Sequence, residues 1–177
     1  MTKLKNATLN NSFSNELPAD LEARNFTRQV YDACFSWVKP KQTAKPSLLI
    51  TSTELAEELG ITDIDSESFV NIVTGNELIE NSKPYAMCYG GHQFGNWAGQ
   101  LGDGRAIVLG QLENEGKTWM LQLKGAGATP YSRNADGLAV LRSSVREFLC
   151  SEAMFHLGIA TTRALSLSLT GDKVIRD

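Results

Sequence analysis

The chain has 177 residues, of which 42% are hydrophobic and 21% are charged, so it is long enough for one ordinary domain with a packed core. Its net charge of −3 argues against a broad basic surface, and we therefore expect no nucleic-acid partner. No apolar run is long enough to cross a bilayer and no signal-peptide core follows the first residue, so we expect a cytoplasmic protein without a membrane partner.

The beginning of the chain shows only weak periodicity. Residues 1–18 are polar and rich in Asn and Ser, so we expect a flexible tail. Apolar residues recur at roughly helical spacing over residues 20–38, which predicts an amphipathic helix that ends before Pro40. Residues 19–84 should therefore form an N-terminal segment that packs on the part of the chain that follows.

Two short helices are expected within this segment. The sequence Thr51-Ser52-Thr53-Glu54 places hydroxyl groups ahead of apolar residues at helical spacing, which is typical of a capped helix. Gly60 should end that helix, and a second helix is expected around residues 66–75.

Glycine-rich loops and strands replace this pattern from residue 85 onward. Six glycines lie within residues 89–105, and glycine at this density marks backbone that turns with positive φ or approaches another group closely. Two β runs, residues 106–112 and 118–124, follow and are joined by a loop that contains a glycine. The sequence therefore predicts a β-hairpin after the glycine-rich stretch.

The last part of the chain should contain one long helix and a pair of strands. Apolar side chains on one helical face predict a helix over residues 136–158, with Asp136 as its N-cap. Residues 164–169 and 173–175 are then predicted to be two strands joined by a turn. Because the sequence stops inside the second strand, we expect a fragment of a larger domain.

One order of residues suits the binding of a nucleotide: Gly102-Asp103-Gly104-Arg105, two strands, Lys124, and a helix that carries Glu147. A loop of this kind lets backbone N–H groups approach phosphate oxygens, and a lysine on a rigid strand supplies a fixed positive charge for them. Glu147 can hold that lysine by an ion pair, as a helical glutamate does in protein kinases.

Each of these residues also has a purely structural interpretation. Strand-terminal lysines and helical glutamates are usually solvated, and Glu152 competes with Glu147 as the partner of Lys124. Ile107 stands where the kinase loop has its third glycine. From the residues alone, Asp136 remains a helix N-cap.

The cysteines and His92 give no sign of a separate reaction centre. Cys34, Cys88 and Cys150 are far apart and lack the C-x-x-C spacing of a zinc site or a redox pair, so we expect reduced, idle thiols. His92 has no Ser, Cys or Asp partner at a recognisable motif spacing, and we interpret it as structural.

Several strings of residues strongly resemble the selenoprotein O family. They are residues 89–95, 100–105, 123–133, 136–137 and 144–149. The resemblance is dense from about Tyr85 to the end of the sequence, thin before it, and covers about the first third of a family member. Together these motifs are specific for the family.

The resemblance implies a protein-kinase-like fold and a protein adenylyltransferase activity, in which ATP binds in a reversed orientation and AMP passes to Ser, Thr or Tyr hydroxyls of protein substrates. It places ATP-binding residues at Gly102, Gly104, Arg105, Lys124, Asp136 and Gly137. It also makes Glu147 the glutamate that pairs with the lysine. The catalytic aspartate, two further phosphate-binding arginines and the ligands of Mg²⁺ are all expected beyond Asp177.

The expected fold is α+β: a protein-kinase-like nucleotide-binding N-lobe with an antiparallel sheet and an αC-like helix, preceded by a helical and extended segment. The lobe should span residues 85–177 and be truncated at its C-terminal end. The whole family protein should use ATP and Mg²⁺, whereas this piece alone should be inactive. Two alternatives stay open: kinase-type phosphoryl transfer from a conventionally oriented ATP, and a non-catalytic domain that binds nucleotides or other proteins.

Overall fold

The strand pair β7 (Ala106–Asn114) and β8 (Lys117–Lys124) forms the centre of the fold in the computed structural model, which describes residues 1–176. Glu115 and Gly116 form the turn between them, with φ of 48° and 76°. Two consecutive residues with positive φ match the twist of an antiparallel hairpin. The predicted hairpin is therefore confirmed, with strands slightly longer than the two β runs.

β7 is the central strand of the main antiparallel sheet. Besides β8 it pairs with β1 (Leu9–Asn10) and β4 (Tyr85–Met87), and β4 pairs in turn with β2 (Phe35–Trp37). Successive residues of β7 enter different hydrophobic clusters, because Ile107 and Val108 point to opposite faces of the sheet. The sheet therefore has a core on each side.

The two predicted short helices are confirmed as α2 (Thr53–Glu58) and α3 (Glu67–Thr74). Each begins after a serine whose hydroxyl accepts a hydrogen bond from a backbone N–H of the first turn, at 3.3 Å for Ser52 and 3.0 Å for Ser66. Both helices contribute side chains to a hydrophobic core that includes Leu109 of β7. They thereby cover one face of the main sheet.

Residues 1–18 are packed on the rest of the chain, which corrects the expectation of a flexible tail. They form the 3₁₀ helix η1 (Leu4–Asn6), strand β1 and the short helix α1 (Ser12–Glu16). The side chain of Leu4 is 1% exposed, and its backbone N–H donates to the Asp63 carboxylate at 2.8 Å. Composition underestimates how well such a segment is ordered, because its few apolar residues pack into a core that is formed mostly by other parts of the chain.

The described segment from residue 20 to residue 38 contains no helix, which corrects a second expectation. The carboxylate of Asp20 pairs with the guanidinium of Arg28 and accepts a hydrogen bond from the Ser36 hydroxyl at 2.7 Å. Asp32 has a positive φ of 53°, which interrupts any regular helix. Partly buried polar contacts thus hold this backbone in an irregular course, and they override the helical spacing of its apolar residues.

The long helix α4 (Leu141–His156) begins later than predicted, and Asp136 is not its N-cap. The N-cap residue is Val140, which offers no side-chain hydrogen bond. Asp136 lies in the preceding loop, where its carboxylate accepts a hydrogen bond from the backbone N–H of Leu138 at 2.9 Å. Asp136 therefore caps a turn ahead of the helix.

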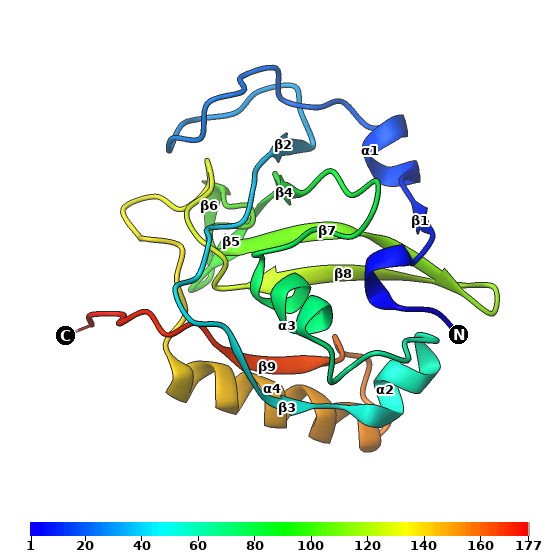
Figure 1. Ribbon diagram of the computed structural model, residues 1–177. Coiled ribbons are helices and arrows are strands. Elements are labelled where there is room, and N and C mark those ends of the chain that lie inside the picture. The colour runs from blue at the N-terminus through cyan, green and yellow to red at the C-terminus, as the bar shows by residue number, and fades with distance from the viewer. Residues whose placement is uncertain (177) are drawn as a thin grey trace.

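Two small antiparallel sheets accompany the main sheet. β3 (Ser47–Thr51) pairs with β9 (Ser166–Leu169), and β5 (Gly90–Gln93) pairs with β6 (Asn96–Gln100). α4, β3 and β9 lie together on the β8 side of the main sheet (Figure 1). This arrangement brings α4 beside the end of β8.

The chain after β9 does not return as a strand, although β9 itself lies where the first strand of the pair was predicted. Residues 173–175 are irregular, and the guanidinium of Arg176 pairs instead with the Asp136 carboxylate at 2.7 Å. The architecture is mixed α+β with antiparallel sheets, as predicted. No helix formed by residues 1–176 has the length and apolar character needed to span a membrane.

Replacing Leu4 with alanine should lower the free energy of unfolding by about 2 to 5 kcal/mol, because the change leaves a cavity in the core. Urea unfolding measures this effect. Leu21→Ala is the matched control, since the Leu21 side chain is 97% exposed and its loss should cost less than about 0.5 kcal/mol. Equally small effects of the two changes would show that the first residues are not packed.

Candidate functional site

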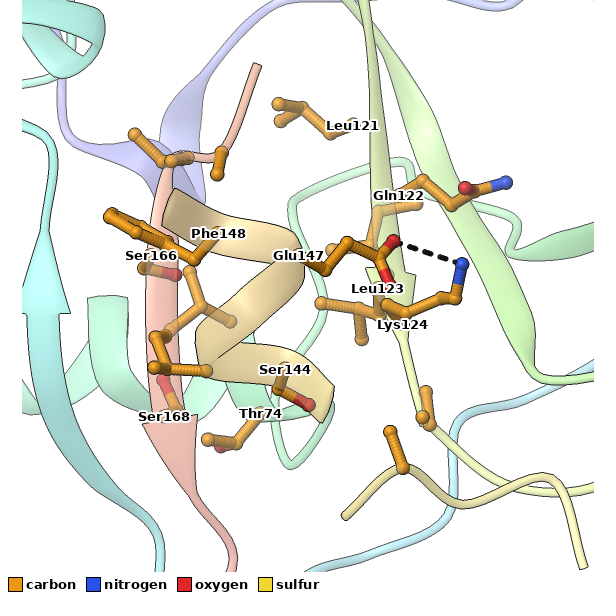
Figure 2. Close-up of a pocket in the computed structure, with 18 of the residues that line it drawn as sticks. Thr74, Leu121, Gln122, Leu123, Lys124, Ser144, Glu147, Phe148, Ser166 and Ser168 are labelled. Atoms are coloured by element: carbon orange, nitrogen blue, oxygen red, sulfur yellow. Dashed lines mark hydrogen bonds and ion pairs between the residues drawn. The ribbon is translucent and has the colours of Figure 1, made fainter. Parts of the chain in front are cut away.

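Lys124 ends strand β8 and forms an ion pair with Glu147 of α4. The Nζ atom of Lys124 lies 3.0 Å from Oε1 of Glu147 (Figure 2). Side chains alternate along β8: Leu121 and Leu123 pack toward the core, and Gln122 and Lys124 point to the other side of the strand. The strand and the helix together determine where the lysine ammonium lies.

Both side chains of this ion pair are open to solvent, with exposed fractions of 48% for Lys124 and 58% for Glu147. An exposed pair of this kind contributes about 0 to 1 kcal/mol to stability. Stability therefore does not explain why Lys124 and Glu147 are present at these positions, whereas a positive charge held in one place is suited to bind an anionic ligand.

Glu152, the alternative partner of Lys124, is engaged elsewhere. Its carboxylate binds the guanidinium of Arg163 at 2.9 Å and accepts a hydrogen bond from the backbone N–H of Ala164 at 2.8 Å. The side chain of Arg163 is 4% exposed, and its hydrogen bond lowers the pKa of Glu152. Glu152 thus anchors the segment after α4, and Glu147 is the carboxylate that reaches Lys124.

The glycine loop, residues 102–104, is packed tightly against Tyr131. Gly102 has φ of 84°, and a Cβ atom there would lie 2.5 Å from Cγ of Tyr131. A Cβ atom at Gly104 would lie 2.8 Å from the Tyr131 carbonyl oxygen. The N–H groups of Asp103 and Gly104 already donate to the carbonyls of Met87 and Gly102, at 2.9 Å and 3.0 Å. Close packing therefore explains these glycines, and two of the loop's N–H groups are bonded within the chain.

A second loop of small residues, 125–128, is locked against the residues that precede α4. The N–H of Gly127 donates to the carbonyl of Gly137 at 3.1 Å. Gly137 has φ of 72°, and a Cβ atom there would lie 2.0 Å from the Gly127 carbonyl oxygen. Only glycine fits at residue 137, and the loop directly after Lys124 has little freedom to move.

The carboxylate of Asp136 is occupied by Arg176. The guanidinium donates to both of its oxygens, at 2.7 Å and 2.9 Å, and these hydrogen bonds lower the pKa of Asp136. A ligand that uses this carboxylate must therefore share it with Arg176 or displace that side chain.

Arg105 lies at the entry to β7, beside the end of β8. Its carbonyl oxygen accepts a hydrogen bond from the N–H of Gly125 at 2.7 Å, and the next residue, Ala106, is the cross-strand neighbour of Lys124. The Arg105 side chain is exposed, and the hydrogen bonds and ion pairs formed among residues 1–176 do not include its guanidinium. It can therefore accept an anionic ligand without breaking a contact within that part of the chain.

A cavity of about 620 Å³ lies between β8, α4 and β9 (Figure 2). Its walls are mostly apolar, and Lys124 and Glu147 border it. Its volume is in the range usual for ligand pockets. The other predicted ATP-binding residues lie outside its lining: Gly102, Gly104, Arg105, Asp136 and Gly137. The structure thus brings Lys124 and Glu147 together at the border of the cavity and places the glycine loop outside it.

Asp103 is a candidate site residue that the sequence interpretation missed. It is 7% exposed, and its carboxylate accepts hydrogen bonds from the Met87 N–H, the Gln122 amide and the Tyr89 hydroxyl. Burial raises the pKa of Asp103, although the hydrogen bonds from Met87 and Tyr89 and the charge of Lys124 act in the opposite direction. The sequence feature that could have pointed to Asp103 is its position between Gly102 and Gly104, two glycines that close packing requires.

His92 and the three cysteines show no sign of a metal centre in the part of the chain that is described. The ring of His92 packs edge to face on Trp97, with centroids 5.2 Å apart, and Cys34, Cys88 and Cys150 are free thiols. Within residues 1–176 there is no group of three or more His, Cys, Asp or Glu side chains that could hold a metal ion.

Comparison with known proteins gives a consistent family match. The family model described as protein adenylyltransferase SelO matches residues 19–177. The protein nucleotidyltransferase YdiU of Flavobacterium johnsoniae is 58% identical over 176 residues, which are 98% of this chain and 34% of that protein. The protein nucleotidyltransferase YdiU of Rhodopirellula baltica is 62% identical over 173 residues, which are 96% of this chain and 32% of the relative. The chain therefore spans about a third of the length of these curated relatives.

Replacing Gly137 with alanine should lower the free energy of unfolding by about 3 kcal/mol or more, because a Cβ atom cannot fit against the Gly127 carbonyl. Gly116→Ala separates this clash from backbone strain, since Gly116 has a similar φ of 76° and nothing within 4 Å of an added Cβ. The control should cost only about 1 kcal/mol. Equal losses in urea unfolding would mean that the two loops are not locked together.

Proposed function

This chain belongs to the family of the protein adenylyltransferase SelO, and we propose that it is the nucleotide-binding portion of an enzyme that transfers AMP from ATP to protein hydroxyl groups. The antiparallel sheet with α4 beside its strand β8 is compatible with a protein-kinase-like N-lobe. In this proposal residues 85–177 form the lobe, and residues 19–84 are a supporting segment.

The ion pair between Lys124 and Glu147 is the observation that carries this proposal. AMP transfer breaks the bond between the α- and β-phosphates of ATP, so negative charge grows on the departing pyrophosphate. A positioned ammonium group can stabilise that charge, and Glu147 restricts the positions that the ammonium adopts. Because β8 and α4 hold the two residues, the positive charge is in place before the nucleotide binds.

We assign distinct roles to the other proposed ATP-binding residues. The exposed guanidinium of Arg105 is suited to bind phosphate oxygens with two parallel hydrogen bonds. Gly102 and Gly104 allow the close packing that determines where Arg105 enters β7. For Asp136 and Gly137, the family resemblance is what supports a contact with the nucleotide.

The family resemblance also implies Mg²⁺ as a cofactor. The residues described here do not fit a metal site, since no suitable group of His, Cys, Asp or Glu side chains forms within residues 1–176. In agreement with the family resemblance, we propose that the metal ligands and the catalytic aspartate lie beyond residue 177 in a longer protein.

ATP should raise the melting temperature of the chain, and Lys124→Ala should lose most of that shift. At about 100 times its Kd, ATP adds about 2.7 kcal/mol of stability, which corresponds to about 5 to 10 °C for a domain of this size. Thermal unfolding with and without ATP measures the shift.

Lys117→Ala is the matched control for this experiment. Lys117 lies at the other end of β8 and also pairs with a glutamate, Glu58, at 2.9 Å, so its loss should leave the ATP shift intact. The proposal is contradicted if the unmodified chain shows no shift or if both variants lose it equally.

The 177-residue chain alone should transfer no AMP, because the resemblance places the catalytic aspartate outside it. Incubation with α-labelled or γ-labelled ATP and a protein acceptor measures both candidate reactions. In a longer protein that contains the missing residues, only the α-label should reach the acceptor. Transfer of the γ-label would support a conventional kinase, and α-labelling by the chain alone would show that its own residues suffice.

A further inference from the structure

Asp103 is a buried acidic residue in the glycine loop that has no role in the reaction proposed above. It lies between Gly102 and Gly104 and is 7% exposed. Burial of a carboxylate costs free energy unless hydrogen bonds and opposite charges offset the loss of water. Buried acids with such surroundings are concentrated at functional sites.

The Asp103 carboxylate connects three parts of the chain. The Met87 N–H of β4 and the Gln122 amide of β8 both donate to its Oδ2 at 3.1 Å, and the Tyr89 hydroxyl donates to its Oδ1 at 3.4 Å. The backbone of Asp103 is held as well, since its N–H donates to the Met87 carbonyl at 2.9 Å and its carbonyl accepts from the Thr129 hydroxyl at 2.7 Å. This single residue therefore fastens the glycine loop to both β4 and β8.

The contact with Gln122 brings Asp103 to the face of β8 that carries Lys124. Residues two apart on a strand point to the same side, and Gln122 and Lys124 do so in Figure 2. Burial raises the pKa of Asp103, and the positive charge of Lys124 acts to lower it over a distance, since the ammonium forms its ion pair with Glu147 and not with Asp103. Lys124 is thus influenced by two carboxylates: the exposed Glu147 and the buried Asp103.

We propose that Asp103 is a positioning residue for Lys124: its carboxylate fastens the glycine loop to β8 through Gln122, and its negative charge favours, together with the ion pair to Glu147, a lysine ammonium that stays at the proposed phosphate site. Water and salt strongly screen the exposed Glu147, whereas they screen a buried carboxylate much less. The consequence for ATP affinity rests on the function proposed above. The electrostatic effect of Lys124 on Asp103 does not depend on that function.

The tyrosines next to Asp103 do not titrate in the pH range in which a carboxyl group does, so the titration of Asp103 can be observed without interference from them. Burial raises the pKa of Tyr85 to about 12 and also raises the pKa of Tyr89, with the charge of Asp103 adding to both shifts. Both tyrosines therefore stay neutral in the acidic range. Because folding raises the pKa of Asp103, its protonated form stabilises the fold, and this contribution is lost as the pH rises through that pKa.

The first test needs no nucleotide. Carboxyl ¹³C NMR follows the titration of Asp103 in the 177-residue chain and in its Lys124→Met and Lys117→Met variants. Removal of the Lys124 ammonium should raise the titration midpoint of Asp103 by about half to one pH unit, and Lys117→Met should leave it unchanged. An unchanged midpoint in Lys124→Met overturns the proposal.

The second test measures ATP affinity by titration calorimetry. Asp103→Asn should weaken binding about three- to tenfold, the size expected for coupled residues, and should have little effect in a Lys124→Met background, where no ammonium is left to position. Asp63→Asn is the matched control, because Asp63 also accepts a backbone N–H, from Leu4, and a hydroxyl, from Ser66, but does so outside the glycine loop. It should leave ATP affinity unchanged.

The outcomes separate this inference from the function on which it builds. An equal loss of affinity from Asp103→Asn with and without Lys124 would show a purely structural role and overturn the inference. If the unmodified chain binds no ATP, the proposed function fails for this chain. The NMR titration, which uses the native Asp103, then still decides whether Asp103 and Lys124 interact.

Discussion

The burial of β7 on both faces is the constraint on which the rest of the structure depends. Its side chains enter three separate hydrophobic clusters, so neighbouring segments hold the strand from both sides of the sheet. The glycine loop leads into its first residue, and the hairpin turn follows its last. β8 then returns along it until Lys124 lies opposite Ala106. The candidate site therefore lies at one end of the strand that pairs with β1, β4 and β8.

Two ion pairs of α4 show how burial distinguishes charges that stabilise the fold from charges that can bind a ligand. The pair of Arg163 with Glu152 is largely buried, and breaking it would leave an uncompensated charge inside the protein. The pair of Lys124 with Glu147 is open to water, and its loss would cost the fold little. α4 is thus attached through one pair and presents the other to solvent, so Glu147 can respond to a ligand while the helix stays in place.

Local patterns predicted the elements whose defining residues lie close together in the sequence, such as the β7–β8 hairpin and the two serine-capped helices. The prediction of a helix over residues 20–38 was wrong because a partly buried ion pair between side chains eight positions apart holds that backbone in another course. The packing of residues 1–18 depends on a core built by distant residues, which composition does not reveal. At the site, the order of motifs could not exclude Glu152 as the partner of Lys124, because tertiary packing brings Arg163 to Glu152. Asp103 was missed for the same reason, since its importance comes from burial.

The contact between Arg176 and Asp136 joins positions 40 residues apart, and it links the state of one to the state of the other. A ligand that binds the Asp136 carboxylate weakens its hydrogen bonds to Arg176. A second ligand that binds Arg176 instead raises the affinity of the first ligand by the same factor. The loop that carries Asp136 is packed closely against Gly127, whose N–H donates to the Gly137 carbonyl. The segment after β9, which carries Arg176, is therefore the part that should move when a ligand binds Asp136. How well this segment is ordered then reports whether the Asp136 carboxylate is bound.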